Sequence, residues 1–215
     1  MNENERRAAL SELNSQVNAC RACPLGGMRN RAVPGEGRID AEIMFIGEAP
    51  GYYEDQQGRP FVGAAGQFLE QLLASIGLKR TDVFIANVIK CRPPQNRDPL
   101  PEEISACSGF LARQIEIIDP KAIVTLGRYS LSKFLPGTPI SKIHGQGRKV
   151  AGRWVVPMYH PAAALHQGSL RRTIEEDFKK IPAFVEQALR EQQTLTEPAV
   201  VAPPKAPEPA QMKLF

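Results

Sequence analysis

Residues 43–51 read IMFIGEAPG, a short apolar run that ends at a glycine and a polar turn. Such a run, bounded by turn residues, is typical of a strand that is buried on both faces. Similar runs occupy residues 83–86, 122–127 and 153–158, and helical patterns lie between them. Short buried strands that alternate with helices predict a parallel sheet covered by helices. The expected fold is α/β, a single-domain α/β/α sandwich around a central, mostly parallel four-stranded sheet.

Apolar residues at helical spacing predict the helices around these strands. The predicted ranges are 3–17, 67–76, 101–118, 130–134 and 170–190. After residue 190 the composition turns to proline, alanine, glutamine and glutamate, which is typical of a disordered segment. We therefore expect a folded domain at 1–190 and a disordered tail at 191–215.

The composition is that of an ordinary globular protein, with 42% hydrophobic and 23% charged residues. No apolar run approaches the ~20 residues that a membrane helix needs, and the polar start is unlike a secretory signal. These features predict a cytoplasmic protein that does not enter membranes. The net charge of +4 leaves nucleic acid open as a partner, and basic residues gather in three places. They are Arg6, Arg7, Arg21, Arg29 and Arg31, then Lys142, His144, Arg148, Lys149 and Arg153, then Arg171 and Arg172.

Polar or glycine-rich segments follow each predicted strand. Residues 47–51 follow the first strand, Asn87 the second, Gly127 the third and His160-Pro161 the fourth. In sheets of this class, ligands bind beyond the carboxyl ends of the strands. We therefore expect the four loops to face one cleft.

The four cysteines are a second chemical signal. Cys20 and Cys23 form a CxxC pair, Cys91 follows the second strand, and Cys107 lies in the next helix. Disulfides are disfavoured in a reducing compartment, so a metal site is the better interpretation. Four thiolates suit either zinc or a [4Fe–4S] cluster, and spacing alone does not separate the two. The alternative is that Cys91 and Cys107 are ordinary buried side chains and that the CxxC pair is a coincidence.

Several motifs follow one another along the chain. They are Gly47-Glu48-Ala49-Pro50-Gly51, Glu54-Asp55, Gly58-Arg59-Pro60-Phe61-Val62-Gly63, Asn87, Lys90-Cys91-Arg92-Pro93-Pro94, Asn96-Arg97-Asp98-Pro99 and His160-Pro161-Ala162-Ala163. Together they resemble the family 4 uracil-DNA glycosylases, the iron–sulfur members of their superfamily. The resemblance covers residues 15–190 and includes the cysteines in family order. It implies a uracil-DNA glycosylase-like fold and a [4Fe–4S] cluster on Cys20, Cys23, Cys91 and Cys107.

The resemblance also implies an enzyme of base-excision repair. Such an enzyme flips uracil out of DNA, hydrolyses the N-glycosidic bond, and leaves free uracil and an abasic site. Phe61 is expected to stack on the base, and Asn87 to pair with its O4 and N3–H edge, which cytosine reverses. His160, as a neutral donor, would stabilise the negative charge at O2. The backbone of Gly47, Glu48 and Ala49 would approach the base and sugar.

The group that positions the attacking water stays open at this stage. Better-known relatives carry an aspartate at the position of Ala49, and family 4 shares its absence. Glu48 is the first candidate and Glu54 the second. Glu54 is alternatively expected to crowd the C5 position and exclude thymine, because this chain has Gly51 where those relatives have a tyrosine. A dissociative cleavage needs little help for the water, so a single essential base is not required.

DNA contacts are expected beyond His160. Leu165 is the candidate wedge that holds the gap open from the minor groove, with a place in a helix core as its alternative. Arg171 and Arg172 are the candidate phosphate contacts. A covalent uracil-trapping relative carries a reactive histidine in a loop after the second strand. Here that loop, residues 93–98, has none, which predicts turnover.

Residues 211–215 read QMKLF and resemble the pentapeptide by which bacterial repair and replication proteins bind the sliding clamp. Gln211, Leu214 and Phe215 would make the contacts, and a hydrophobic end without a partner is the alternative. Two other functions compete with the enzyme. A DNA-binding protein without catalysis explains only the basic groups, and an electron-transfer protein explains only the cysteines. We expect a monofunctional glycosylase, because no evident lysine nucleophile for strand cutting lies in the cleft. We also expect the protein to be a monomer.

Overall fold

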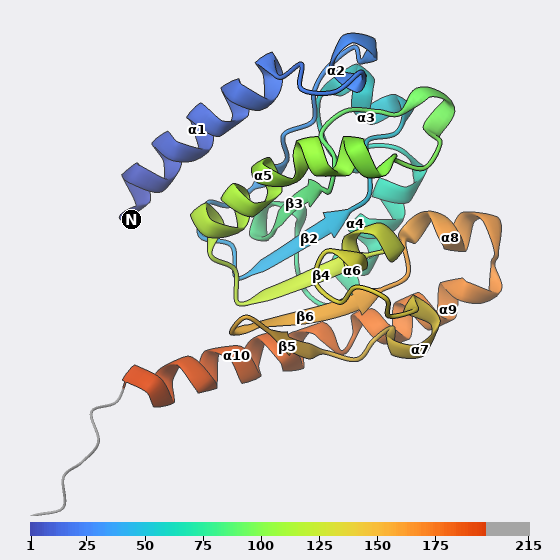
Figure 1. Cartoon of the computed structure of the whole chain (residues 1–215). Coiled ribbons are helices and arrows are strands. Elements are labelled where there is room, and N and C mark those ends of the chain that lie inside the picture. The colour runs from blue at the N-terminus through green and yellow to red at the C-terminus, as the bar shows by residue number, and fades with distance from the viewer. Residues whose placement is uncertain (197–215) are drawn as a thin grey trace, which may run out of the picture.

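The computed structural model describes residues 1–196 (Figure 1). Over that range the chain forms one sheet of six strands in the order β1-β3-β2-β4-β6-β5, with helices packed around it. The strands are β1 (Glu36–Gly37), β2 (Ile43–Gly47), β3 (Phe84–Asn87), β4 (Ala122–Leu126), β5 (Arg148–Val150) and β6 (Arg153–Met158). The predicted α/β class is confirmed.

The four predicted strands form the parallel centre of the sheet. β2 pairs in parallel with β3 and β4, and β4 pairs in parallel with β6. β1 and β5 add antiparallel edges on β3 and β6. The predicted count of four strands is therefore wrong at the edges. Edge strands of two and three residues are too short to show the alternation by which a strand is recognised.

The helices within residues 1–196 are more numerous than the sequence pattern predicts. They are α1 (Glu3–Ala19), α2 (Leu25–Met28), α3 (Tyr52–Gln57), α4 (Ala64–Ser75), α5 (Pro101–Ile118), α6 (Arg128–Ser132), α7 (Ile140–Ile143), α8 (Pro161–His166), α9 (Ser169–Phe178) and α10 (Ile181–Thr196), with 3-10 turns η1 (Arg80–Asp82) and η2 (Pro94–Asn96). None of the helices in residues 1–196 combines the length and the apolar character needed to cross a membrane.

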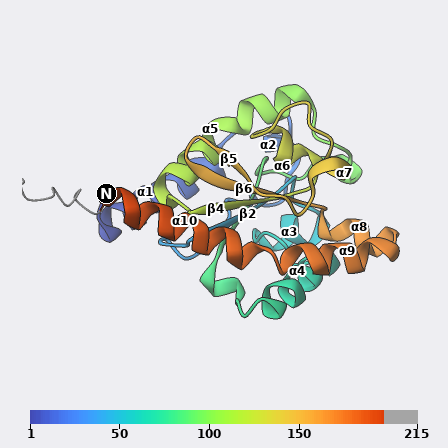
Figure 2. The ribbon, with the colours of Figure 1, turned by 90° about the horizontal axis from the view of Figure 1, so that it is seen from below.

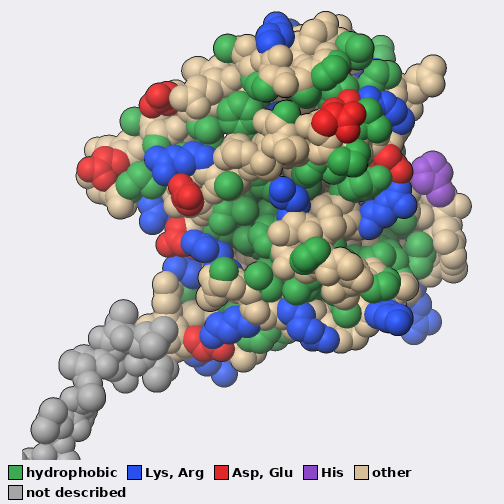
Figure 3. Space-filling view, in the orientation of Figure 1, with side chains coloured by type: hydrophobic (Ala, Val, Ile, Leu, Met, Phe, Trp, Pro, Cys, Tyr) green, Lys and Arg blue, Asp and Glu red, His purple; other side chains and the backbone are tan. Residues whose placement is uncertain are grey.

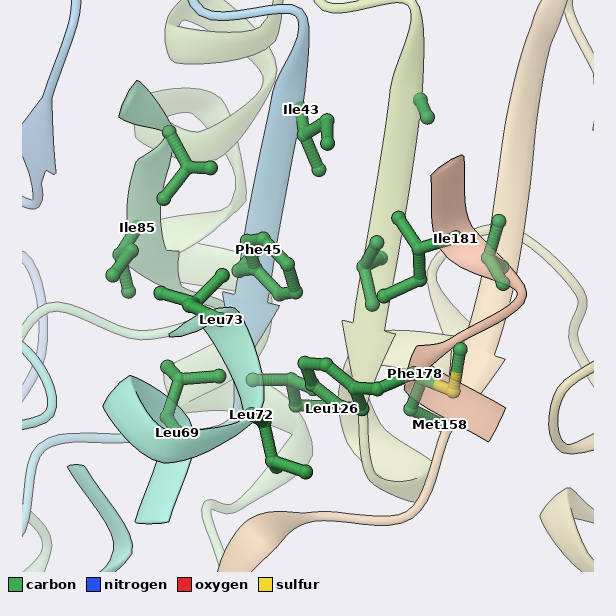
Figure 4. Close-up of a cluster of buried hydrophobic side chains, with 14 of the residues drawn as sticks. Ile43, Phe45, Leu69, Leu72, Leu73, Ile85, Leu126, Met158, Phe178 and Ile181 are labelled. Atoms are coloured by element: carbon green, nitrogen blue, oxygen red, sulfur yellow. The ribbon is translucent and has the colours of Figure 1, made fainter. Parts of the chain in front are cut away.

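Two hydrophobic layers enclose the sheet. Alternate side chains of β2 point to opposite faces, so Phe45 joins one layer while Met44 and Ile46 join the other. The first layer is formed with α4, α9 and α10, and the second with α1 and α5, as the view from below shows (Figure 2). In the first layer Phe45 stacks on Phe178 with ring centroids 5.9 Å apart, and the side chains of α4 close over them (Figure 4).

α1 is attached to the body along its second half. Leu13 and Val17 are buried against the layer that contains α5. An Asn2–Glu5 capping box begins the helix, which offsets the unpaired N–H groups of its first turn. The helix ends directly before Cys20, so its docking delivers the first cysteine to the rest of the protein.

The predicted helix at 170–190 is two helices. α9 ends at Phe178 and α10 begins at Ile181. Pro182 explains the break, because its ring collides with the carbonyl four residues earlier and it has no N–H to donate. α10 then continues to Thr196, so residues 191–196 are helical where a disordered segment was predicted. The rest of the predicted tail, including the clamp motif, lies outside the described residues.

Candidate functional site

A cavity of about 680 Å³ lies at the carboxyl ends of the parallel strands, where the sequence predicts a cleft. Loops after β2, β3, β4 and β6 all contribute to its wall. The lining residues that were predicted from the sequence are Glu48, Ala49, Glu54, Phe61, Asn87 and His160. Gly47 lies directly beneath them, since a Cβ added there would stand 2.3 Å from Asn87 Oδ1 and 2.7 Å from the Phe61 ring.

Asn87 ends β3 with a buried side chain. Its Oδ1 is fully buried and has no hydrogen-bond partner within residues 1–196. Buried polar atoms are almost always paired, so an unpaired acceptor in a cavity wall points to a ligand that donates a hydrogen bond. The amide can accept through its oxygen and donate through its nitrogen, which suits a planar ring with the complementary pair.

Phe61 is held in an unusual backbone conformation beside this amide. Its φ is +52°, in the left-handed region that non-glycine residues rarely adopt. Its ring stacks on that of His160, with centroids 5.5 Å apart and planes 26° apart. Phe61 therefore presents a fixed aromatic face at the cavity.

Two charged side chains anchor the Phe61 loop. Glu54 Oε1 accepts from the N–H groups of Val62 and Gly63 at 2.9 and 3.0 Å, and Oε2 accepts from that of Gly51 at 3.1 Å. Arg80 Nη1 donates to the carbonyl of Phe61 at 2.8 Å, and Nη2 donates to the carbonyl before it. Both carboxylate oxygens of Glu54 therefore accept hydrogen bonds from the backbone and hold the Phe61 loop, a role that the sequence does not reveal.

His160 caps the N-terminus of α8. Its Nδ1 accepts a hydrogen bond from the N–H of Ala162 at 3.1 Å, so the neutral ring carries its proton on Nε2. Desolvation lowers the pKa of His160 to about 4, although nearby Glu54 acts in the other direction. At neutral pH the cavity wall therefore holds an uncharged imidazole that can donate from Nε2.

Glu48 is the acidic group of the cavity whose protonation is most altered. Burial raises the pKa of Glu48 to about 7, the negative charge of Asp98 adds to this, and Arg128 opposes it. Asp98 and Arg128 form an ion pair at the same rim. Glu48 thus changes charge near neutral pH, as a group that acts on water or on a cationic intermediate would.

The predicted DNA contacts lie outside the cavity wall. Leu165 is 49% exposed on α8, which contradicts the helix-core alternative. Arg171 donates to Glu175 and Gln71, and Arg172 to Glu176, so both guanidinium groups already have partners. Figure 3 shows further Lys and Arg side chains over the lower part of the face in view.

The four cysteines come together in a second, smaller cavity. Its other walls are largely apolar, with Val17, Ala22, Ala106 and Phe110. Three N–H groups point at the sulfur atoms. Arg29 Nη1 lies 2.8 Å from Cys91 Sγ, Lys90 N lies 3.3 Å from Cys107 Sγ, and Ala22 N lies 3.5 Å from Cys20 Sγ.

Comparison with known proteins identifies the family of this chain. The protein family described as the Uracil DNA glycosylase superfamily matches residues 34–192 of this chain. A type-4 uracil-DNA glycosylase of Sulfurisphaera tokodaii is 52% identical over 80% of this chain and 83% of its own length. Type-4 enzymes of Archaeoglobus fulgidus and Saccharolobus solfataricus are 48% and 50% identical, over 80% and 77% of this chain and 92% and 82% of their own lengths.

The chain belongs to the type-4 uracil-DNA glycosylases. The resemblance seen in the sequence motifs is thereby confirmed. In this chain the two cavities share one short segment, because Asn87 ends β3 and Cys91 lies four residues later. Lys90 lies between them, fully buried, and its Nζ donates to the carbonyl of Asn87 at 2.8 Å and to Gln114 Oε1 at 2.6 Å. Asn87 is therefore tied to α5 as well as to the sheet.

All four cysteines of this type-4 chain line one cavity, and four thiolates suit an iron–sulfur cluster. Within residues 1–196 no three acidic, histidine or cysteine side chains are close enough to hold one metal ion. Burial raises the pKa of Cys107 to about 11 and raises that of Cys91, so their thiolates need a positive centre nearby.

The sequence did not reveal the side chains whose hydrogen-bond partners lie far away along the chain. Arg80 and Arg29 belong to this class, since the first holds the Phe61 loop and the second donates to Cys91. Each is an arginine among many, and its partner lies far away in sequence. The only sequence signal is position: Arg29 lies between two motif segments, and Arg80 lies four residues before β3.

Proposed function

We propose that this protein is a uracil-DNA glycosylase of base-excision repair. It flips uracil from DNA into the cavity, hydrolyses the N-glycosidic bond, and releases uracil from an abasic site. One observation carries the proposal: the buried, unpaired Oδ1 of Asn87 faces a cavity walled by Phe61 and His160. The high identity to type-4 enzymes supports the same reaction.

Asn87 supplies the choice of base. Its Oδ1 accepts from uracil N3–H while its Nδ2 donates to O4. Cytosine presents an acceptor and a donor at these places, so the same amide would face two like groups. Rejection of cytosine follows, because polar groups would be buried without partners. The ring of Phe61 fixes the plane in which the base must lie.

His160 and Glu48 act on the two fragments of the broken bond. As the bond to N1 breaks, negative charge develops on uracil O2, and the Nε2–H of neutral His160 stabilises it. The ionised carboxylate of Glu48 orients the water that adds to the sugar C1′. The water's hydroxyl joins the sugar, and its proton leaves with uracil. No lysine lines the cavity within residues 1–196, which supports release without strand cutting.

Cys20, Cys23, Cys91 and Cys107 would hold a [4Fe–4S] cluster. Their shared cavity and the N–H groups directed at their sulfur atoms support this assignment. The cluster would supply a cross-link between the end of α1, the loop after β3 and α5. The cluster would take part in no step of the hydrolysis, which depends on the side chains of the uracil cavity alone.

The remaining assignments stay predictions. Leu165 is exposed as a minor-groove wedge must be, on the helix that His160 begins. Arg171 and Arg172 each use Nε on a carboxylate, so other N–H groups of these exposed guanidinium groups could contact phosphates. The clamp contacts of Gln211, Leu214 and Phe215, the monomeric state and the cytoplasmic location are likewise predictions.

One experiment tests the function directly. Purified protein is incubated with oligonucleotides that contain a single uracil, and alkali then cleaves the strand at any abasic site. We expect cleavage at uracil after alkali and none before it, and no cleavage of matched oligonucleotides with thymine or cytosine. A preparation that contains the cluster and leaves no alkali-labile sites would refute the proposal.

A further inference from the structure

Two tyrosines stand exposed on α3, beside the uracil cavity. Tyr52 is 52% exposed and Tyr53 is 59% exposed, although most large apolar side chains in residues 1–196 are buried. Their rings meet edge to face, with centroids 5.4 Å apart and planes at 81°. An exposed aromatic pair next to a ligand cavity suits the stacking of a flat partner.

Arg92 adds a positive charge to this surface. Its guanidinium lies over the Tyr52 ring, 5.1 Å from the centroid, and its Nε donates to Asn96 Oδ1 at 2.7 Å. No carboxylate neutralises it among the residues that the structure describes. The other N–H groups of the guanidinium are therefore available to a phosphate, which arginine binds well.

This surface is continuous with the uracil cavity. Gly51 lines the cavity and directly precedes Tyr52. Asn96 lines it as well, and is the residue that the arginine contacts. A Cβ added at Gly63 would lie 3.4 Å from the Tyr53 ring, so that ring packs against the loop of the stacking phenylalanine. A nucleotide joined to a base in the cavity can reach the tyrosines without leaving the protein surface.

We propose that Tyr52, Tyr53 and Arg92 form a subsite for the nucleotide next to the flipped uracil on the same strand. The proposal rests on the binding of uracil in the adjoining cavity. The neighbouring base stacks on the face of one exposed tyrosine, whose ring the other tyrosine contacts edge to face, and Arg92 donates to its phosphate. In a duplex this base is held by its own pair and stack. The subsite therefore favours single-stranded or locally melted DNA.

The test uses binding, so that it does not depend on cleavage. The probes are fluorescein-labelled single-stranded 11-mers with a tetrahydrofuran abasic mimic at the centre. Two further probes lack the base of the adjoining nucleotide, one on the 5′ side and one on the 3′ side. By anisotropy, we expect the full-length protein to bind one of these two about tenfold more weakly, as loss of a base–aromatic stack does.

Variants then test whether this loss of affinity comes from stacking on the tyrosines. The Tyr52→Ala/Tyr53→Ala protein should bind the complete probe about tenfold more weakly than the parent protein, and removal of the neighbouring base should then cost it nothing further. The Tyr52→Phe/Tyr53→Phe protein keeps both rings and should match the parent. On uracil substrates, the alanine variant should raise the KM for single strands but not for duplexes.

Two results would overturn the subsite. The first is equal binding of all three probes by the unaltered protein, which decides the matter even if no variant folds. The second is an equal loss of affinity on removal of the neighbouring base in the parent protein and in the alanine variant. That result would show that the base stacks somewhere other than on the tyrosines. An absence of uracil release by the unaltered protein would instead refute the proposed function, and the anisotropy result would stand apart from it.

Discussion

At the scale of single residues, Asn87 carries a local energetic cost at the cavity. A buried acceptor without a partner destabilises a protein by about 1–3 kcal/mol, and this one lies where the base would bind. A ligand that donates to Oδ1 removes that cost, so pairing of this acceptor contributes to the free energy of ligand binding. The strand-end position of Asn87 is evident in the sequence, whereas its missing partner is a property of the folded cavity.

Asn87→Asp tests the base reader. A carboxylate accepts but does not donate, so it repels uracil O4 while it can accept from cytosine N4. We expect uracil release to fall by about 100-fold or more, the range seen when a catalytic-site hydrogen-bond donor is lost. Weak release of cytosine should appear. Alkali cleavage of paired uracil and cytosine substrates measures both, and an unchanged preference would contradict the role of Asn87.

Glu48→Gln tests the pKa of a single carboxyl. Because burial raises the pKa of Glu48 to about 7, the carboxylate forms only as the pH rises through 7. The kcat of the parent protein should increase from pH 6 to pH 8, and the variant should be slower and lack that increase. A pH–rate profile that keeps its shape in the variant would assign the titration to another group.

The same shift has a consequence for stability. A carboxyl with a raised folded-state pKa binds its proton more tightly in the folded than in the unfolded state. Its contribution is therefore present below pH 4.5, the ordinary value, and is lost as the pH rises towards 7. Glu48→Gln should reduce this pH dependence of the free energy of unfolding, as urea titrations at pH 5 and pH 8 can measure.

At the scale of elements, the Phe61 loop depends on charges outside it. The glycines of this loop are visible in the sequence and predict an unusual backbone. The groups that select the conformation are not, because Glu54 lies on α3 and Arg80 on η1. The break between α9 and α10 differs in kind, since Pro182, which causes it, is visible in the sequence. Short edge strands and caps likewise form only in the context of their neighbours.

Arg80→Ala should loosen this loop. The change removes the hydrogen bonds to the carbonyls of Phe61 and its neighbour, each worth about 1.5–3 kcal/mol when a charged group donates. We expect a higher KM and weaker inhibition by free uracil, with a smaller effect on kcat. Glu70→Gln is the matched control, because Glu70 is an exposed and more distant partner of Arg80, at 3.5 Å. Equal effects of both substitutions would contradict the anchoring role.

At the scale of the whole molecule, the parallel strands account for what the sequence predicts well. Each strand is one apolar run with a polar end, so both the sheet and the edge that holds the site follow from local pattern. The meeting of Cys20 with Cys107 depends instead on how α1 docks against α5. A pattern of spacing does not contain that docking, and the identity of the cluster came from resemblance.

Cys91→Ala should affect both cavities at once. It removes one proposed ligand of the cluster and should loosen the segment that begins at Asn87. We expect less iron per chain, a lower Tm and weaker uracil binding. Each kcal/mol lost lowers the Tm by about 2–4 °C in a chain of this size. Met28→Ala, at a 64% exposed position on nearby α2, should change none of these. Unchanged iron, Tm and binding in Cys91→Ala would remove the structural role.

The course of α10 bears on how the protein can be handled. Glu191 and Gln192 adjoin the amino ends of β4 and β6, and α10 leads away from the cavity edge (Figure 1). A surface or reporter attached at an exposed position near the end of α10 would therefore hold the molecule on the side away from the cavity. Immobilised in this orientation, the enzyme would present its substrate face to solution, as a sensor for damaged DNA on a chip requires.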